Sequence, residues 1–283
     1  SRSPDDVIRE VRGLVAAGAG EVSLLGQNVN SYGKKEGFCS FSELLARVND
    51  IDGLERIRFA TSHPKDLSPE LARSFGVLDK LCNHFHLPVQ SGSSPVLKRM
   101  NRKYTREDYI EKIDWLRQAR GDIAVSTDII VGFPGETVDD FEQTMSLLRL
   151  IEFDSIFAFM YSDREVAPAS TFSGKISEDE KKQRLKTVLE IQTGISEEKN
   201  KAYEGTTVAV LVEGLSKSAE TANTSAVQPA TSRERQWSGR TTTNKVVNFT
   251  VDETLSDVDT VVPGSVVRVR IENGFAHSLN GTA

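Results

Sequence analysis

The stretch STDIIVGFPGETVDDF, residues 126–141, decides the fold of this chain. Its first half contains the apolar run DIIV, which predicts a buried strand, and Gly132 and Gly135 predict a tight turn after that strand. Thr137 and Asp140 have the spacing of a capping pair that opens a helix. We expect the helix start to leave N–H groups free, and an anionic group can bind there. An ordinary loop between strand and helix has the same pattern, so neighbouring motifs must decide.

Polar residues also follow two other predicted strands at the points where these strands end. The strand 21–25 is followed by GQNVNSYG (26–33), and the strand 84–89 is followed by QSGSS (90–94). Ligands of α/β folds bind at the carboxyl ends of parallel strands, which meet at one edge. The sequence therefore predicts one binding site built from three strand ends.

Strands and helices alternate from the start of the chain to residue 160. Apolar spacing predicts helices at 5–17, 41–48, 69–75, 106–120 and 138–150, and β-rich runs predict strands at 21–25, 56–60, 84–89, 123–131 and 155–160. Ser3 is the expected N-cap of the first helix, with Pro4 after it. This alternation predicts an α/β fold with a parallel sheet.

The pattern changes after residue 176. Ser177 and Glu180 predict the capped start of a helix to about residue 203, whose inner face carries Leu185, Val188, Leu189 and Gln192. Short β runs at 207–212, 245–251 and 266–271 then predict a small antiparallel barrel. The Ser-, Ala- and Thr-rich tract 217–232 is interpreted as a loop insertion. We thus expect a domain at 1–176, a connecting helix at 177–204 and a domain at 205–283.

Composition limits the possible functions. No apolar run approaches the roughly 18 residues that span a bilayer, so we expect no membrane partner and a cytoplasmic location. The net charge of -6 means that any contact with nucleic acid must be local. The two cysteines, Cys39 and Cys82, lie far apart, which predicts buried or half-buried structural thiols and no metal site.

Six motifs together resemble one enzyme family, the radical S-adenosylmethionine methylthiotransferases. These motifs are LLGQNVNSYG (24–33), RFATSHP (58–64), HLPVQSGS (86–93), LKRMNRKYT (97–105), STDIIVGFPGET (126–137) and YSDR (161–164). The string Gln27-Asn28-Val29-Asn30 is similar to the tRNA-modifying branch that acts on dimethylallyladenosine. Two alternatives within the family are the branches for threonylcarbamoyl-adenosine in tRNA and for ribosomal protein. A non-catalytic RNA-binding protein is the alternative from another class.

The resemblance implies a radical SAM partial (βα) barrel at 1–176 and a TRAM RNA-binding domain at 205–283. It implies that the whole enzyme uses S-adenosylmethionine, two [4Fe–4S] clusters and an electron donor protein to add a methylthio group to C2 of N6-isopentenyl-adenosine in tRNA. A Cys-x3-Cys-x2-Cys loop is absent from this sequence. We therefore interpret the chain as an inactive fragment that lacks an amino-terminal domain, the cluster loop and the first barrel strand, and we expect no cluster in it.

The resemblance and the polar strand ends together give a set of candidate site residues. For S-adenosylmethionine they are Gln27, Asn28, Ser62, Gln90, Ser91, Asp128, Gly132, Phe133, Tyr161 and Arg164. Catalytic residues stay unknown because the cluster cysteines are missing, and His63 is more often a structural histidine than a catalytic one. For RNA the candidates are the basic stripe Lys98, Arg99, Arg102 and Lys103, together with Trp237 and Arg240. Solvated surface remains the alternative for both RNA sets.

Overall fold

The computed structural model describes residues 1–60, 62–164, 167–216, 236–251 and 261–283. The chain divides into two compact units, one of residues 1–17 and 21–195 and one of residues 18–20 and 196–283. One stretch interpreted from the sequence, the Ser-, Ala- and Thr-rich tract 217–232, falls outside the described residues.

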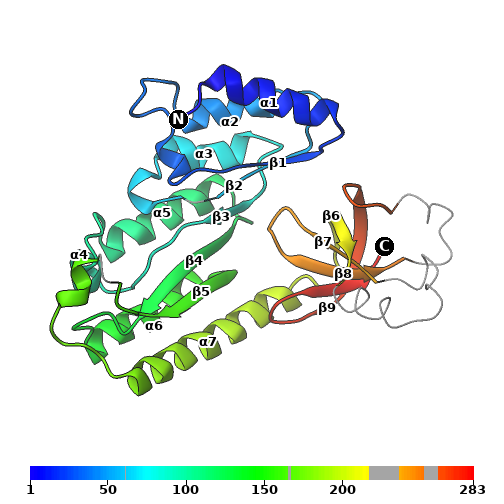
Figure 1. Ribbon diagram of the computed structural model, residues 1–283. Coiled ribbons are helices and arrows are strands. Elements are labelled where there is room, and N and C mark those ends of the chain that lie inside the picture. The colour runs from blue at the N-terminus through cyan, green and yellow to red at the C-terminus, as the bar shows by residue number, and fades with distance from the viewer. Residues whose placement is uncertain (61, 165–166, 217–235, 252–260) are drawn as a thin grey trace. The chain divides into compact units, whose positions relative to one another are not determined.

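The first unit alternates strands and helices as predicted (Figure 1). Its helices are α1 (Pro4–Ala16), α2 (Phe41–Asn49), α3 (Pro69–Val77), α4 (Ser94–Arg99), α5 (Arg106–Ala119) and α6 (Val138–Ile151). Its strands are β1 (Glu21–Leu24), β2 (Arg56–Phe59), β3 (His84–His86), β4 (Ala124–Val131) and β5 (Ser155–Met160). Every predicted helix and strand of this region is present, and the short helix α4 is an addition.

All strand pairs of the first unit are parallel, but they form two sheets where we expected one. Strands β1 and β2 make one sheet, and β3, β4 and β5 make the other. Among the described residues, the one bridge next to β2 on this side joins Ile57 to Leu81, which precedes β3. In Figure 1 the five strands follow one another in chain order, from β1 in blue to β5 in green. Their carboxyl ends therefore form one continuous edge.

Apolar side chains from helices and strands fill one core in the first unit. Phe75, Phe85 and Tyr109 are among the largest fully buried side chains, and the rings of Phe59, Phe75 and Phe85 pack with centroids 5.4–5.9 Å apart. Burying this many aromatic and branched side chains is the dominant favourable contribution to folding. The core fixes the strand ends that carry the candidate site.

Helix α7 (Glu178–Lys201) starts in the first unit and ends in the second. Val188 is fully buried, and the Gln192 amide donates to the Phe153 carbonyl at 2.7 Å, as expected for its inner face. Leu189 departs from the prediction, because 45% of it is exposed and it lines a surface groove with Met160 and Leu185. The capping interaction at Ser177 is one-sided, since the Glu180 carboxylate pairs with Arg184 instead.

The second unit is a closed five-stranded barrel. Its strands are β6 (Thr207–Leu215), β7 (Trp237–Arg240), β8 (Val246–Thr250), β9 (Val266–Gly274) and β10 (Leu279–Thr282), in the order β10-β8-β7-β6-β9. The barrel was predicted as antiparallel, and all pairs are antiparallel except β10 with β8. Its core includes Val210, Val247 and Phe249.

The sequence did not predict β7 and β10, and their glycines explain why. A Cβ on Gly239 would lie 2.2 Å from the Leu211 carbonyl oxygen, and one on Gly281 would lie 2.1 Å from that of Arg270. Both glycines therefore serve the close approach of a neighbouring backbone inside a strand. Read without a structure, they resemble turn residues.

None of the helices in the described ranges has the length and apolar character needed to cross a membrane.

Candidate cofactor and RNA-binding site

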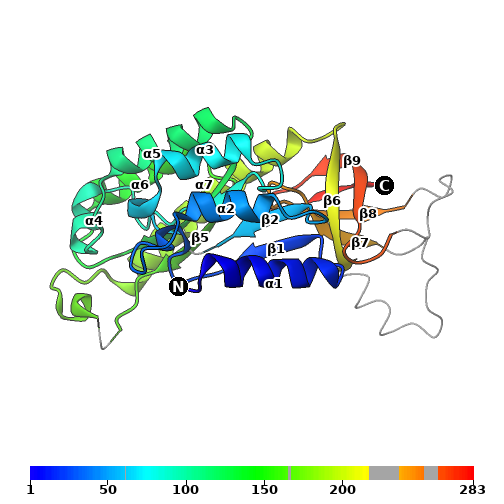
Figure 2. The same ribbon diagram turned by 90° about the horizontal axis from the view of Figure 1, so that it is seen from above.

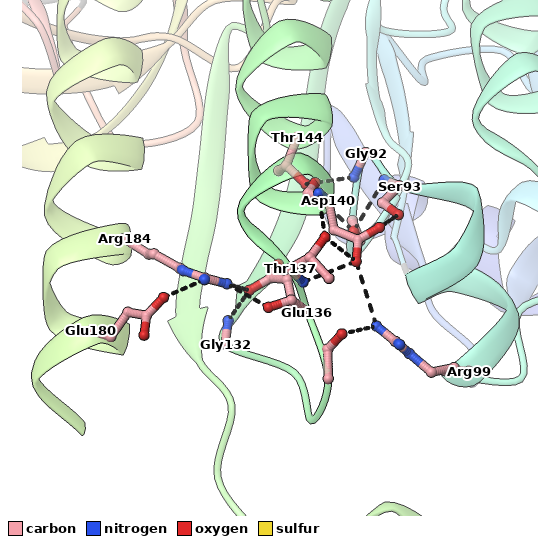
Figure 3. Close-up of polar contacts among 12 residues, drawn as sticks. Gly92, Ser93, Arg99, Gly132, Glu136, Thr137, Asp140, Thr144, Glu180 and Arg184 are labelled. Atoms are coloured by element: carbon pink, nitrogen blue, oxygen red, sulfur yellow. Dashed lines mark hydrogen bonds and ion pairs between the residues drawn. The ribbon is translucent and has the colours of Figure 1, made fainter. Parts of the chain in front are cut away.

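The Gly-rich turn after β4 is built as predicted up to the start of the helix. Figure 3 shows the turn between Gly132 and Thr137, with α6 rising from it. The Asp140 N–H donates to Thr137 Oγ1 at 3.1 Å, and the Thr137 N–H donates to Asp140 Oδ2 at 2.9 Å. The predicted capping pair is therefore present. It places the chain's own carboxylate at the helix start, where we expected free N–H groups to receive a ligand.

Asp140 also ties this turn to the loop after β3. Ser93 Oγ donates to Asp140 Oδ1 at 2.5 Å, and Arg99 of α4 lies 3.7 Å from Oδ2 while donating to the Gly135 carbonyl at 2.7 Å. Burial alone would raise the pKa of Asp140, but the bonds from Ser93 and Thr137 and the charge of Arg99 lower it. Asp140 thus holds two strand ends together as a carboxylate (Figure 3).

Gly132 is held by a buried ion pair rather than open to a ligand. Its N–H donates to Glu136 Oε2 at 2.5 Å, and Arg184 of α7 donates to the same oxygen at 2.7 Å (Figure 3). The backbone of Gly132 has φ +73°, and a Cβ there would lie 2.4 Å from Lys181 Cγ. The space that glycine leaves is therefore filled by Lys181. Burial raises the pKa of Glu136, and the Gly132 N–H and Arg184 oppose that rise.

The ends of β1 and β2 form a second polar cluster. Asn28 donates to Asp66 Oδ2 at 2.7 Å, and the buried Asn30 amide exchanges two 3.0 Å hydrogen bonds with the backbone N–H and carbonyl of His63. Asn28 Oδ1 and the Ser62 hydroxyl are buried, and neither has a partner among the described residues. Each such buried polar atom calls for an explanation, and a bound ligand is one.

Gln90, in the segment that follows β3, has an unusual backbone conformation. Its φ is +74°, although it is not glycine, and its N–H and carbonyl bond at 2.8 Å to the β4 backbone at Asp128 and Ile130. Its amide lies 3.5 Å from Asp128 Oδ2. A side chain forced into this conformation at a strand end indicates a functional position. The neighbouring Ser91 is fully buried, and its hydroxyl accepts a hydrogen bond from the Ser93 N–H at 3.2 Å. This bond stabilises the loop.

A row of polar side chains across β3 and β4 was not predicted from the sequence. Ser126 Oγ lies 3.0 Å from His84 Nε2 and 2.9 Å from His86 Nδ1, and His86 Nε2 lies 3.4 Å from Asp128 Oδ1. Phe157 of β5, 56% exposed, stands beside Asp128 in register and meets the His86 ring. The spacing of two between the histidines, and between Ser126 and Asp128, was the available indication that these side chains share one face.

The remaining cofactor candidates lie in more varied surroundings. Phe133 is buried, with Tyr161 and Phe172 packed edge-on against its ring at centroid distances of 5.1 and 6.2 Å. Tyr161 is half-buried and donates to Asp163 at 3.0 Å. Gln27 and Arg164 are exposed. The structure therefore brings Gln90 close to Asp128 and Asn28 close to Asp66, while Ser62 is buried next to His63 in the sequence.

The predicted basic stripe divides into exposed and engaged cations. Lys98 and Lys103 are exposed, and neither ammonium group bonds to another described residue. Arg99 is engaged at the Gly-rich turn, and Arg102 Nη1 lies 3.2 Å from His63 Nε2. Two lysines thus remain available for a partner without breaking an internal contact.

The two RNA candidates of the barrel are also engaged. Arg240 pairs with Glu213 at 3.0 Å on the surface. Trp237 packs against the barrel core, and its buried Nε1 has no partner within the described ranges. The indole ring therefore has less exposed surface on which a base could stack than it would have in a solvated loop.

Within the described parts of the chain, no group of three or more His, Cys, Asp or Glu side chains is placed to hold a metal. Cys82 is buried, which raises the pKa of its thiol, and Cys39 is half-buried. One thiol is buried and the other half-buried, as predicted. The described residues do not fit a [4Fe–4S] cluster, which needs several thiolates in one place.

Residues 1–148 match the family model described as the radical SAM superfamily, and the chain belongs to this superfamily. It is 60% identical over 283 residues to tRNA-2-methylthio-N(6)-dimethylallyladenosine synthase of Desulfosudis oleivorans. It is 47% identical over 282 residues to the protein of the same name from Clostridium botulinum, strain Okra. These alignments cover 100% and 99% of the chain but only 59% and 58% of the relatives, so the chain spans less than two thirds of their length.

Among solved structures, coproporphyrinogen III oxidase (HemN) of Escherichia coli, described as a radical SAM enzyme, aligns with a TM-score of 0.49 and 15% identity. The alignment covers 68% of this chain and 46% of that one. At this score the likeness adds nothing to the family assignment.

Proposed function

We propose that this chain is the cofactor- and tRNA-binding body of a methylthiotransferase that modifies C2 of N6-isopentenyl-adenosine in tRNA. The 60% identity along the whole chain to a protein named for this reaction carries the proposal. The two clusters, the electron donor protein and the cytoplasmic location belong to the same proposal for the whole enzyme. So do the partial barrel, connecting helix and TRAM domain at 1–176, 177–204 and 205–283.

The strand ends fit S-adenosylmethionine, whose ammonium, carboxylate, ribose and adenine need several donors and acceptors. Asn28 Oδ1 is a buried acceptor suited to the ammonium, and the Ser62 hydroxyl is a second buried atom that a ligand would complete. Asp128, held by His86 and facing Gln90, offers carboxylate oxygens to ribose hydroxyls. The roles of Gln27, Ser91, Gly132, Phe133, Tyr161 and Arg164 rest on the resemblance alone. Bound S-adenosylmethionine would supply the radical chemistry of the family.

The chain's own residues then bind and orient the two substrates. His86 Nε2 and the Gln90 amide nitrogen lie 3.4 and 3.5 Å from the Asp128 carboxylate oxygens, and the Gln90 N–H and carbonyl are both hydrogen-bonded to the β4 backbone. Since the described residues do not fit a cluster, we assign no reductive step to them. Exposed Lys98 and Lys103 would contact tRNA phosphates, with Arg240 and Trp237 as further contacts on the barrel.

Binding of a tRNA anticodon stem-loop that carries dimethylallyladenosine tests this proposal. We expect the K98A/K103A variant to bind more weakly, with a slope of log affinity against log salt that is smaller by about 0.7–0.9 for each lost contact. The control is K182A/K186A on α7, whose lysines are similarly exposed but each pair with an acid. No measurable binding of the parent chain, or equal slopes for both variants, would refute the RNA part of the proposal.

A further inference from the structure

The ring of His63 faces a hydrogen-bond donor at each of its two nitrogens. The Lys65 N–H donates to Nδ1 at 3.2 Å, and Arg102 Nη1 lies 3.2 Å from Nε2. A neutral imidazole carries one proton and can accept at only one nitrogen, and an imidazolium accepts at neither. One of the two contacts is therefore between two donors.

Of the two donors, the Lys65 N–H is held in place by its backbone, so the contact at Nδ1 is the hydrogen bond. The Lys65 N–H belongs to a short 3-10 turn that starts at His63, and the His63 backbone is clamped on both sides by the buried Asn30 amide. The Arg102 side chain can move, whereas this backbone cannot. Nδ1 is thus the acceptor and Nε2 carries the proton, so that Nε2–H and the Arg102 guanidinium converge as two donors 3.2 Å apart.

The charges around the ring favour an anion between these donors. Arg102, Lys65 and Asp66 face His63, and Asp66 is already engaged by Lys34 at 2.6 Å and Asn28 at 2.7 Å. Burial first, and then the charges of Arg102 and Lys65, lower the pKa of His63, which keeps the ring neutral. Tyr104 packs edge-on at 5.8 Å and holds the ring orientation.

We propose that His63 Nε2–H and Arg102 together bind one phosphodiester oxygen of the RNA backbone. This inference rests on the proposed tRNA-binding function. Arg102 already belongs to the basic stripe, and the inference adds His63, which neither the stripe nor the resemblance assigns to RNA. Arg102 lies beside exposed Lys103, so the site continues the cationic surface on which we place the RNA. One oxygen accepting from both groups removes the conflict between the donors.

A matched pair of variants tests the role of Nε2. His63→Gln places an amide N–H near the position of Nε2, whereas His63→Asn places one near Nδ1 only. We expect H63Q to bind the stem-loop within about twofold of the parent and H63N to bind about fivefold more weakly, as for one lost neutral hydrogen bond. The salt slope should be unchanged in H63N and smaller by about 0.7–0.9 in Arg102→Gln, because only Arg102 neutralises a phosphate charge. Thermal unfolding of each variant serves as the folding control.

Three outcomes of the RNA-binding and NMR measurements would overturn the inference. They are parent-like RNA affinity in H63N, equal losses in H63N and H63Q, and ¹⁵N NMR of the free chain showing the proton of His63 on Nδ1. Weaker binding of S-adenosylmethionine with unchanged RNA binding would also overturn it, since the oxyanion would then be the cofactor carboxylate. If the parent chain binds no RNA, the proposed function fails first, and the NMR result still reports on the tautomer.

Discussion

At the scale of single residues, Asp140 occupies the start of α6, where the sequence predicted that free N–H groups would bind an anionic ligand. The residue satisfies the start of α6, accepts from Ser93 and lies near Arg99. A carboxylate at a helix N-terminus is stabilised by the free N–H groups and the helix dipole. The Asp140 side chain therefore occupies the anion-binding position of this turn.

The lowered pKa of Asp140 gives a prediction about acid stability. Its folded pKa lies below the ordinary value of 3.8, so its contribution to stability is present above that value and is lost as pH falls through the folded pKa. We expect Asp140→Asn to cost about 1–2 kcal/mol at pH 7. Urea unfolding should show that the stabilities of parent and variant converge as the pH falls through the folded pKa of Asp140. A pH-independent difference would contradict this role.

Residue patterns predicted local contacts well and distant ones poorly. Thr137 and Asp140 are three apart, and their capping interaction follows from that spacing. Lys181, on a helix far along the chain, fills the space beside Gly132, and no local sequence pattern predicts this contact. The Asn30 clamp on His63 is equally distant in sequence, although both residues lie in motifs that the resemblance picked out.

At the scale of elements, the position of α6 depends on a glycine in the loop after β3. A Cβ on Gly92 would lie 2.5 Å from Thr144 Cα and 2.6 Å from the Gln143 carbonyl oxygen, and the Gly92 N–H donates to Thr144 Oγ1 at 2.9 Å. The helix therefore packs directly on this backbone. The sequence placed this glycine in a polar segment at a strand end. The structure shows that glycine is needed there because α6 packs directly on the backbone.

Gly92→Ala should destabilise the first unit by about 1–3 kcal/mol, because α6 would have to move away. Gly13→Ala is the control, since a Cβ there meets nothing within 4 Å and alanine favours the helix by up to about 1 kcal/mol. Denaturant unfolding should separate the two variants in opposite directions. Equal stability of G92A and the parent would show that α6 has room to shift.

Helix α7 is joined to the Gly-rich turn by the buried pair of Arg184 and Glu136, whose side chains are 7% and 1% exposed. Arg184→Met should cost about 3–5 kcal/mol, because it leaves a buried carboxylate unpaired. Lys182→Met is the control on the same helix, since its pair with Asp179 is exposed and contributes little. Adding Glu136→Gln to R184M should recover part of the loss. Similar unfolding midpoints for R184M and K182M would contradict this account.

At the scale of the whole molecule, the order of helices and strands followed from periodicity, while their grouping did not. No local pattern shows that, within the described part of the chain, β2 pairs with the next segment at a single bridge, so the expected single sheet became two. Likewise β7 and β10 complete the barrel through glycines that resemble turns. The strand ends that carry polar residues were predictable because parallel strands bring their carboxyl ends to one edge.

The central claim is that this chain can serve as the body of a tRNA methylthiotransferase. The most direct measurement replaces the aligned part of the Desulfosudis oleivorans protein, 59% of its length, with this chain. The chimera would be expressed in a host that lacks the enzyme, and mass spectrometry would quantify methylthio-modified dimethylallyladenosine in tRNA. We predict the modified nucleoside with the parent chimera and less of it with K98A/K103A. A folded chimera that leaves dimethylallyladenosine unmodified, while the Desulfosudis protein modifies it in the same host, would contradict the account.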